Sequence, residues 1–489
     1  MTNVLFVSAE AAPFAKTGGL ADVVGSLPKA LRQLGIDARV VMPFYGFLDY
    51  QRFNLSHLFS FQFPRTVGLS DVHVHTTIHE GVPFYFVQCW PHFGIEGEVY
   101  GGWEWDMPRF IFLSQIAMAV AWELKVRTGW FPHIFHVHDW HTGLLPFLVE
   151  ISRGDPNWAN VGTIMTIHNI AYQGEHAGGW LYQLGIPGRH QPDLVYQNKT
   201  DNLLGMGIAY ADIVTTVSPR YAIEIQYPYM GYGLDGMIRT RLGDLYGILN
   251  GIDYETLNPE TDPAIAVNYN VDNFAECRPH NKRELQANMH LPVRDDVMVI
   301  GMVSRLDWQK GIDLIIPALH RLLDDSDVQF IGLGSGNPHY NYEMSRLAER
   351  FPWRARMYIG YSSELAQRIY AGCDLFLMPS YFEPCGIGQM IAMRYGALPL
   401  VRETGGLADT VTNYDNGPAD TGTGFVFNWT ETDALYHTLR WALDTYHNRR
   451  EAWQRMQTRA MQTDFSWASS ARKYIDLYQK LIEQRGMTT

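Results

Sequence analysis

The sequence has few cysteines and no long apolar run. Its four cysteines are scattered among 489 residues without the spacing of a metal site, and this usage favours a reducing cytoplasm over a disulfide framework. No apolar stretch approaches the roughly 20 residues that a membrane-spanning helix needs. No basic leader precedes the first strand-like run, NVLFVSA. We therefore expect a soluble, cytoplasmic protein that has no membrane partner.

The sequence also lacks an excess of basic charge. Its formal net charge is −13, which argues against a nucleic-acid partner and against binding to an anionic membrane. A phosphate site would therefore have to be built from a few placed cations. Charge blocks and low-complexity tracts are missing too, so the length favours two globular domains, each with its own core.

Short apolar runs alternate with longer stretches of helical period, a pattern that is typical of parallel sheets covered by helices. We predict strands in two sets, at 4–9, 38–42, 134–138, 163–167, 212–217 and 245–249, and at 297–303, 328–333, 356–360, 374–378 and 397–401. Turn formers cluster at 250–263, between the two sets. The sequence thus predicts an α/β fold with domains at 1–249 and 250–463, followed by a helical segment at 464–489.

Neither the dinucleotide-binding pattern GxGxxG nor the P-loop pattern GxxxxGK[ST] is present, so a Rossmann dehydrogenase and a nucleoside triphosphatase are not supported. The hexapeptide TGGLAD instead occurs twice, at 17–22 and at 404–409. Each copy follows a predicted strand and opens a helix, where backbone N–H groups and the helix dipole favour an anion. The alternative is that the glycines only cap a turn. The duplication, and Lys16 before the first copy, favour a phosphate site. GLGSG at 332–336 is a third, weaker candidate.

Two further motifs follow predicted strands of the second half. SRLDWQKG carries Arg305 and Lys310 at a strand's carboxyl end, where open parallel sheets bind ligands, and such a pair suits a diphosphate. SYFEPCG places Glu383 in a strand-end turn, with helix capping as the alternative role. We expect Cys385 to be a buried small residue, because no histidine or lysine close in sequence would lower its pKa.

The segment HVHDWH at 136–141 raises a rival interpretation, a metallohydrolase site. Its spacing differs from HxHxDH. A strand would also place His136 and His138 on one face and Asp139 on the other. We therefore predict no metal, with Asp139 in a ligand cleft and the histidines in structural roles.

The motifs KTGGLADVV, HDWHTGL, TIHNIAYQG, LNGID, SRLDWQKG, FEPCGIGQM and TGGLADTV, in this order, resemble those of the bacterial glycogen synthase and plant starch synthase family over nearly the whole chain. That resemblance implies the GT-B fold, in which two Rossmann-like, doubly wound domains face a central cleft. It further implies that the first domain is on the acceptor side, the second is on the donor side, and the C-terminal helix returns to the first domain.

The resemblance implies a retaining glucosyltransferase that moves glucose from ADP-glucose to the nonreducing 4-hydroxyl of an α-1,4-glucan or malto-oligosaccharide. It implies front-face attack, no cofactor and a bacterial-type cytoplasmic location, with association with glucan granules left open. A preference for UDP-glucose also stays open, as does a noncatalytic glucan-binding scaffold. An α-glucan phosphorylase would need pyridoxal phosphate on a lysine and a much longer chain.

The resemblance also assigns site residues. The catalytic set is Lys16, Asp139, His168, Arg305, Lys310 and Glu383. The donor-binding set is Gly18, Gly19, Asp22, Asn169, Asn250, Tyr361, Cys385, Gly386, Thr404, Gly405 and Gly406. In these roles Arg305 and Lys310 hold the diphosphate, and the backbone carbonyl of His168 lies beside the anomeric carbon. Tyr361 is a stacking surface for adenine. Candidate acceptor platforms are Trp103, Trp105, Trp130 and Trp140.

Overall fold

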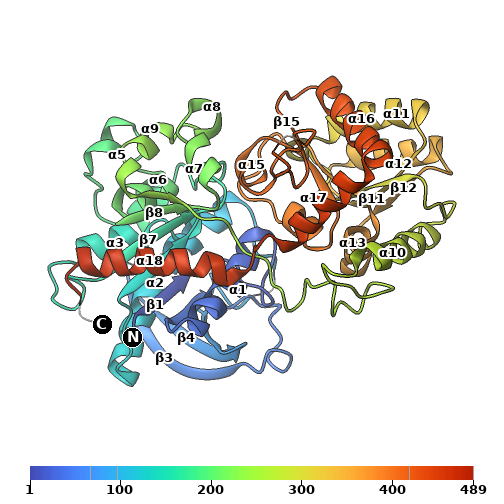
Figure 1. The fold of residues 1–489 in the computed structure, drawn as a ribbon. Helices are drawn as coiled ribbons and strands as arrows, with labels where there is room; N and C mark the ends of the chain where they lie inside the picture. The colour runs from blue at the N-terminus through green and yellow to red at the C-terminus, as the bar shows by residue number, and fades with distance from the viewer. Residues whose placement is uncertain (67, 96, 418, 488–489) are drawn as a thin grey trace. The chain divides into compact units, whose positions relative to one another are not determined.

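The computed structural model describes residues 1–66, 68–95, 97–417 and 419–487. The chain divides into two compact units, Met1–Gly251 with Trp467–Thr489, and Ile252–Ser466. Each unit contains one largely parallel sheet with helices packed on it (Figure 1). No helix within the described ranges is both long and apolar enough to cross a membrane.

The first unit is built on a nine-stranded sheet in the order β3-β4-β5-β2-β1-β6-β7-β8-β9. The strands are β1 (Asn3–Val7), β2 (Asp37–Pro43), β3 (Ser56–Arg65), β4 (Gly68–His79), β5 (Val82–Gln88), β6 (Ile134–His138), β7 (Gly162–Ile167), β8 (Ile213–Thr216) and β9 (Leu245–Gly247). From β5 to β9 all neighbours are parallel, and β3 and β4 are added in antiparallel fashion. All six strands predicted for this half are present.

The antiparallel edge was missed by the sequence analysis. Its signal was the alternation in VHVHTTIH, which places successive side chains on opposite faces. Glu80 and Gly81 form the two-residue connection between β4 and β5, and both have positive φ, 48° and 80°. That conformation matches the tight turn whose twist suits a hairpin.

The helices of the first unit are α1 (Gly19–Gln33), α2 (Trp103–Thr128), α3 (Leu145–Ile151), α4 (Gly178–Gln183), α5 (Pro192–Tyr196), α6 (Leu203–Tyr210), α7 (Pro219–Glu224), α8 (Pro228–Gly231), α9 (Asp235–Arg239) and α18 (Trp467–Gln484). Apolar residues of α1 recur at helical spacing and face the core, among them Val23, Leu27 and Leu31. Helix α18, red in Figure 1, packs beside α1, and its Tyr474 and Tyr478 belong to the same core.

The second unit has a six-stranded, fully parallel sheet in the order β12-β11-β10-β13-β14-β15. Its strands are β10 (Met298–Val303), β11 (Val328–Gly334), β12 (Ala355–Ile359), β13 (Leu375–Met378), β14 (Leu398–Arg402) and β15 (Phe425–Phe427). The five predicted strands are confirmed, and β15 is an addition. Its helices are α10 (Phe274–Asn288), α11 (Ile312–Asp325), α12 (Pro338–Arg350), α13 (Ser363–Gly372), α14 (Gly388–Arg394), α15 (Gly405–Thr410), α16 (Thr432–Asn448) and α17 (Arg450–Gln462).

Both sheets reverse their strand order at the first strand. In the first unit β1 lies between β2 and β6, and in the second β10 lies between β11 and β13. Loops leaving the carboxyl ends of the two strands at such a reversal diverge, and the crevice between them is where doubly wound sheets bind ligands. The loops after β1 and β6, and those after β10 and β13, carry five of the six predicted catalytic residues, all except His168.

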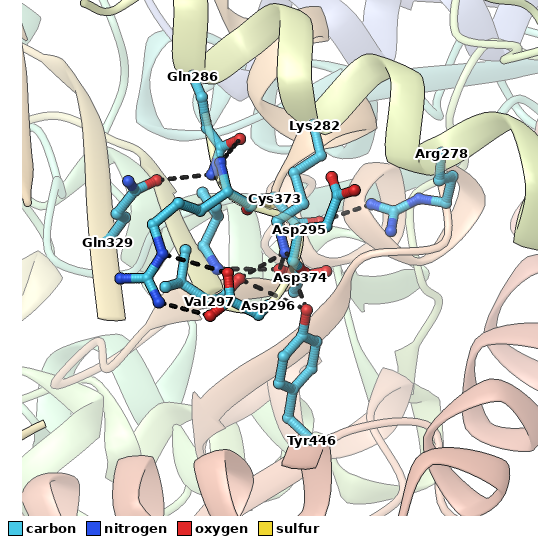
Figure 2. A network of polar contacts seen from close by, with 12 residues as sticks. Arg278, Lys282, Gln286, Asp295, Asp296, Val297, Gln329, Cys373, Asp374 and Tyr446 are labelled. Carbon is cyan, nitrogen blue, oxygen red and sulfur yellow. Dashed lines mark hydrogen bonds and ion pairs between the residues drawn. The ribbon is translucent and has the colours of Figure 1, made fainter. Parts of the chain in front are cut away.

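A buried ion pair joins α10 to the amino-terminal end of β13. Figure 2 shows the side chain of Lys282 extending from α10 toward Asp374 and Tyr446. Its Nζ lies 2.8 Å from Asp374 Oδ2, 2.9 Å from the Tyr446 hydroxyl and 2.5 Å from the Val297 carbonyl oxygen. Burial alone would lower the pKa of Lys282, but Asp374 and Tyr446 outweigh it and raise the pKa.

We expect Lys282→Met to destabilise the protein by about 3–5 kcal/mol, because it leaves the Asp374 carboxylate buried without its counter-charge. Arg283→Met is the matched control. The neighbouring Arg283 pairs with Asp295 at the surface, with side chains 42% and 56% exposed, and an exposed pair contributes at most about 1 kcal/mol. Urea unfolding of both variants measures the difference. Equal losses would contradict the buried-pair account.

Candidate active site

A buried carboxylate organises the loop after β1. Glu10 is 3% exposed, and its Oε2 accepts the N–H groups of Thr17 at 2.6 Å and Gly18 at 3.0 Å. The Tyr100 hydroxyl donates to the other oxygen of Glu10. The sequence analysis missed Glu10, although its place directly after a buried strand was a signal. Two amides expected to face an anion are therefore already bonded to a carboxylate.

The two glycines of this loop, Gly18 and Gly19, border open space. A Cβ added to Gly18 or Gly19 would meet no atom within 4 Å, so packing does not explain these glycines. Lys16 Nζ lies 2.6 Å from Asp22 Oδ1, and both side chains are partly exposed. The predicted set of Lys16, the two glycines and Asp22 thus lies together at the start of α1, where a ligand could approach the backbone closely.

Asp139, at the carboxyl end of β6, ties that strand end to the loop after β7. Its Oδ1 accepts the backbone N–H of His168 at 2.7 Å and is 3.4 Å from that of Asn169. Its φ of 54° is unusual for a non-glycine residue. Burial raises the pKa of the Asp139 carboxyl to about 7, although the two amides favour the ionised form. Three predicted site residues, Asp139, His168 and Asn169, are therefore in direct contact.

His136 and His138 are buried, and the half-buried His168 continues them into a column of three histidine rings. The rings of His136 and His138 stack with centroids 4.5 Å apart, which confirms that they share one face of the strand. His138 Nδ1 lies 3.0 Å from His168 Nε2, and His136 Nδ1 lies 2.8 Å from the Tyr478 hydroxyl of α18. Burial lowers the pKa of His136 and His168 to about 3. The column is therefore neutral at ordinary pH.

No three histidine, cysteine, aspartate or glutamate side chains in the described part of the chain are grouped so that they could hold a metal ion. Among the other predicted residues of this unit, Asn250 is buried, and its Oδ1 has no hydrogen-bond partner among the described residues. Trp130 is also buried, and its indole N–H donates to Asp37 at 2.8 Å. That contact makes Trp130 a core residue and not an acceptor platform. Trp103 is half exposed.

In the second unit, Lys310 and Glu383 form an ion pair. Lys310 Nζ lies 2.6 Å from Glu383 Oε2, and the Ser380 hydroxyl donates to the same oxygen at 3.0 Å. The side chains of Lys310 and Glu383 are 17% and 8% exposed. Arg305 is nearer the solvent, 65% exposed, with Asp307 3.2 Å away. The pair joins the loops after β10 and β13, which lie on either side of the strand-order reversal.

Backbone contacts lock these two loops together. Gly311 has a φ of +72°, and a Cβ there would lie 2.3 Å from the Pro379 carbonyl oxygen. Gln309 donates from its side chain to the Phe382 carbonyl at 3.2 Å. Arg402 Nε donates to the Ser380 carbonyl at 2.7 Å. Gln309 and Arg402 position the turn that holds Glu383, and the sequence analysis missed both because their partners are distant in sequence.

The second TGGLAD copy packs against the turn that carries Glu383. A Cβ on Gly405 would lie 1.9 Å from the Glu383 carbonyl oxygen, and one on Gly406 would lie 2.0 Å from that of Cys385. The Gly406 N–H donates to the Glu383 carbonyl at 3.0 Å. The amide expected to face phosphate is thus used inside the fold. Close backbone packing accounts for these two glycines, in contrast to Gly18 and Gly19.

The last predicted residues of the second unit differ in exposure. Cys385 is buried, as expected, and Thr404 is fully buried at the start of α15. Gly386 has a φ of +71° in the turn after Glu383. Tyr361, which follows β12, is 87% exposed, as a stacking surface must be.

The third glycine loop, GLGSG, supports the loop that carries Arg305. A Cβ on Gly334 would lie 1.8 Å from the Ser304 carbonyl oxygen, and one on Gly336 would lie 2.4 Å from that of Leu306. Leu306 and Gly336 also form a parallel bridge. These glycines are therefore explained by backbone packing.

Comparisons with known proteins agree along the whole chain. The starch synthase catalytic domain model matches residues 3–240, and the model for glycosyl transferases group 1 matches residues 288–460. Glycogen synthase 1 of Geobacter sulfurreducens is 42% identical, with 99% of this chain and 97% of the relative covered. Glycogen synthase of Streptococcus sanguinis is 43% identical, with 98% of this chain and 100% of the relative covered.

Solved structures match the whole chain as well. The catalytic domain of starch synthase IV from Arabidopsis thaliana superposes with a TM-score of 0.88 at 33% identity and covers 99% of both chains. Sucrose-phosphate synthase from Thermosynechococcus elongatus has a TM-score of 0.62 at 17% identity, covers 99% of this chain and 100% of its own, and supports the fold alone. The predicted GT-B fold is confirmed by the first of these matches.

The neutral histidines predict acid sensitivity. Burial holds the pKa of His136 at about 3, against an ordinary value of 6.5. Between these values the unfolded chain binds more protons, so the free energy of unfolding falls as the pH drops. His136→Gln should reduce that slope by about 1.4 kcal/mol per pH unit near pH 5. Urea unfolding from pH 4.5 to 7.5 measures it.

Asp139→Asn tests a contribution of opposite sign to the pH dependence of the free energy of unfolding. The folded-state pKa of Asp139 is raised from 3.8 to about 7, so in this window the folded protein binds the additional proton and gains stability toward acid. Asp139→Asn removes that proton site, so the free energy of unfolding should fall more steeply as the pH drops. A steeper slope for His136→Gln, or a shallower one for Asp139→Asn, would contradict the assigned protonation states.

The second glycines of the two TGGLAD copies give a matched pair of substitutions. Gly406→Ala should destabilise by about 1–3 kcal/mol, because its methyl group would overlap the Cys385 carbonyl. Gly19→Ala should be neutral or stabilising by up to about 1 kcal/mol, because its methyl group enters open space at the start of a helix. Thermal unfolding compares the two. Similar losses would mean that both copies are packing motifs.

Proposed function

The chain belongs to the family of glycogen and starch synthases, and on that premise we propose that it transfers glucose from ADP-glucose to the nonreducing 4-hydroxyl of an α-1,4-glucan. The anomeric configuration is retained. The observation that carries this proposal is the Lys310–Glu383 ion pair at the strand-order reversal of the second sheet. It supplies a placed cation and a carboxylate at the position where this kind of sheet binds ligands.

Charge stabilisation on the leaving group is the main requirement of this reaction. Breaking the bond between the anomeric carbon and the phosphate oxygen leaves negative charge on ADP. Lys310 is held by Glu383 and is only 17% exposed, so its charge acts in a medium less polar than water. An ammonium group has three N–H donors. One donor of Lys310 binds Glu383, and the others can bind the diphosphate. Arg305, on the same loop, adds a planar guanidinium that suits phosphate oxygens.

Glu383 serves the sugar as well as the lysine. The hydrogen bonds from Lys310 and Ser380 both go to Oε2, and we assign Oε1 to a glucose hydroxyl. The turn itself is held from behind by Gly405, Gly406 and Arg402. A carboxylate on a turn fixed in this way orients the transferred sugar without becoming its nucleophile.

In the first unit, His168 acts through its backbone. Its N–H is bound by Asp139 at 2.7 Å, which sets the orientation of the neighbouring peptide groups. Burial lowers the pKa of the His168 imidazole to about 3, so at neutral pH the ring is uncharged and lacks the acidic proton of an imidazolium. The positive charge that develops at the anomeric carbon is stabilised by the carbonyl oxygen, a dipole that needs no titration.

The reaction needs no other reagent. The bond from the anomeric carbon to the phosphate oxygen breaks, the bond to the acceptor O4 forms on the same face, and the acceptor's proton passes to a phosphate oxygen of departing ADP. No cofactor takes part. The solved starch synthase IV domain is bound to ADP and acarbose, which supports a nucleotide and a glucan as ligands. The exposed ring of Tyr361 is the proposed surface for adenine.

The first test is transfer of radiolabelled glucose to glycogen, with ADP-glucose and UDP-glucose in parallel and no added metal. Lys310→Ala should lower kcat by about 100-fold or more, the loss typical of removing one preorganised group that stabilises transition-state charge. Lys473→Ala, an exposed lysine on α18, is the control and should match the wild type. A fully active Lys310→Ala would remove Lys310 from the mechanism, and faster transfer from UDP-glucose would overturn the donor assignment.

A further inference from the structure

A cavity in the second unit borders α15. It has a volume of about 490 Å³ and lies among α15, β15, α16 and the segment that follows β15. Gly405 and Gly406 at the start of α15 pack on the Glu383 turn, whereas Ala408 and Val411 line the cavity. The cavity is therefore distinct from the candidate donor site, although the same short helix borders both.

The cavity has an exposed indole in its wall. Trp429 is 74% exposed, and its side chain has no hydrogen bond or aromatic contact with the rest of the described chain. Val426 and Phe427 continue the apolar part of the lining. The indole of Trp429 therefore offers an apolar face beside the cavity, on which the ring of a ligand could stack.

Polar groups face the same space. Asn413 uses its Oδ1 to accept the Val426 N–H at 2.8 Å, which leaves its amino group as a donor. Asn428 contributes a second amide and Glu403 a carboxylate. Donors and acceptors placed around an aromatic face are the groups that bind a sugar ring, because its hydroxyls form hydrogen bonds and its C–H face stacks on the indole.

The charges of the lining side chains indicate whether the cavity favours a sugar or a nucleotide as its ligand. The residues that line this cavity include no lysine or arginine, and Glu403 is the one charged side chain among them. A phosphate group would meet a carboxylate without a counter-charge, which is unfavourable. A neutral, hydroxylated ligand has no such cost. The lining therefore favours a carbohydrate over a nucleotide.

We propose that this cavity is a noncatalytic binding site for a neutral α-glucan chain, with Trp429 as its stacking platform. The proposal rests on the proposed function, because that function makes an α-1,4-glucan the substrate. A glucan held here would keep a large branched acceptor near the enzyme between transfers. A short oligosaccharide would gain nothing, since a molecule bound here carries no further acceptor ends that could react.

The test compares binding to a large glucan with reaction of a short one. Trp429→Ala should weaken the apparent affinity for glycogen, measured by retardation in native gels, by about fivefold to tenfold, the effect of losing one aromatic stacking contact. The kcat/KM for maltotriose should not change. Trp429→Phe should restore most of the retardation. Trp353→Ala is the matched control, since Trp353 is 69% exposed and lies outside the cavity.

The outcomes separate this proposal from the proposed function. Unchanged retardation for Trp429→Ala, or an equal loss for Trp353→Ala, would overturn the glucan site and leave the transferase assignment intact. A second equivalent of ADP bound by the wild type and lost in Trp429→Ala would also overturn it in favour of a nucleotide. If the wild type transferred no glucose while glycogen retardation still depended on Trp429, the proposed function would fail and this site would stand.

Discussion

A carboxylate removed from water must be hydrogen-bonded or paired with a cation, and the candidate site is built around three groups that meet this constraint. Glu10 binds the N–H groups of Thr17 and Gly18, Asp139 binds that of His168, and Glu383 binds Lys310. The Asp139 and Glu383 bonds each join two loops that are distant in sequence, and the Glu10 bonds close the loop between β1 and α1 on itself. Because a buried carboxylate needs these partners, each of the three also links the chain segments that provide them.

The two units differ in the source of their polarity. In the first unit, burial keeps the histidine column neutral and raises the pKa of the Asp139 carboxyl, so backbone dipoles supply the polarity. In the second unit, the Lys310–Glu383 pair and Arg305 supply formal charge. A glycosyl transfer from a diphosphate places a large negative charge on one fragment and a partial positive charge on the other. In the proposed reaction the formal charges of the second unit would act on the first fragment, and the dipoles of the first unit would act on the second fragment.

The repeated hexapeptide shows where prediction from sequence reaches its limit. Both copies were expected to form a glycine loop at a helix start, and both do. Their environments differ, because carbonyl oxygens lie about 2 Å from where side chains would begin at Gly405 and Gly406, and nothing lies near Gly18 and Gly19. Six identical residues contain no information about what packs on them. Likewise, Gln309 and Arg402 were missed because they bond to backbone atoms of a distant turn, for which no local pattern exists.

The sequence by itself determined the alternation of strands and helices, the two-unit organisation and the strand ends at which polar residues gather. These follow from hydrophobic periodicity and from the chemistry of turn residues, which act over a few positions along the chain. Only the tertiary structure decided that Lys310 pairs with Glu383, that His136 contacts Tyr478 of the C-terminal helix, and that Trp429 stands beside a cavity. The physical reason is that pairing, burial and open space depend on which segments meet across the fold, and that is settled by packing of the whole unit.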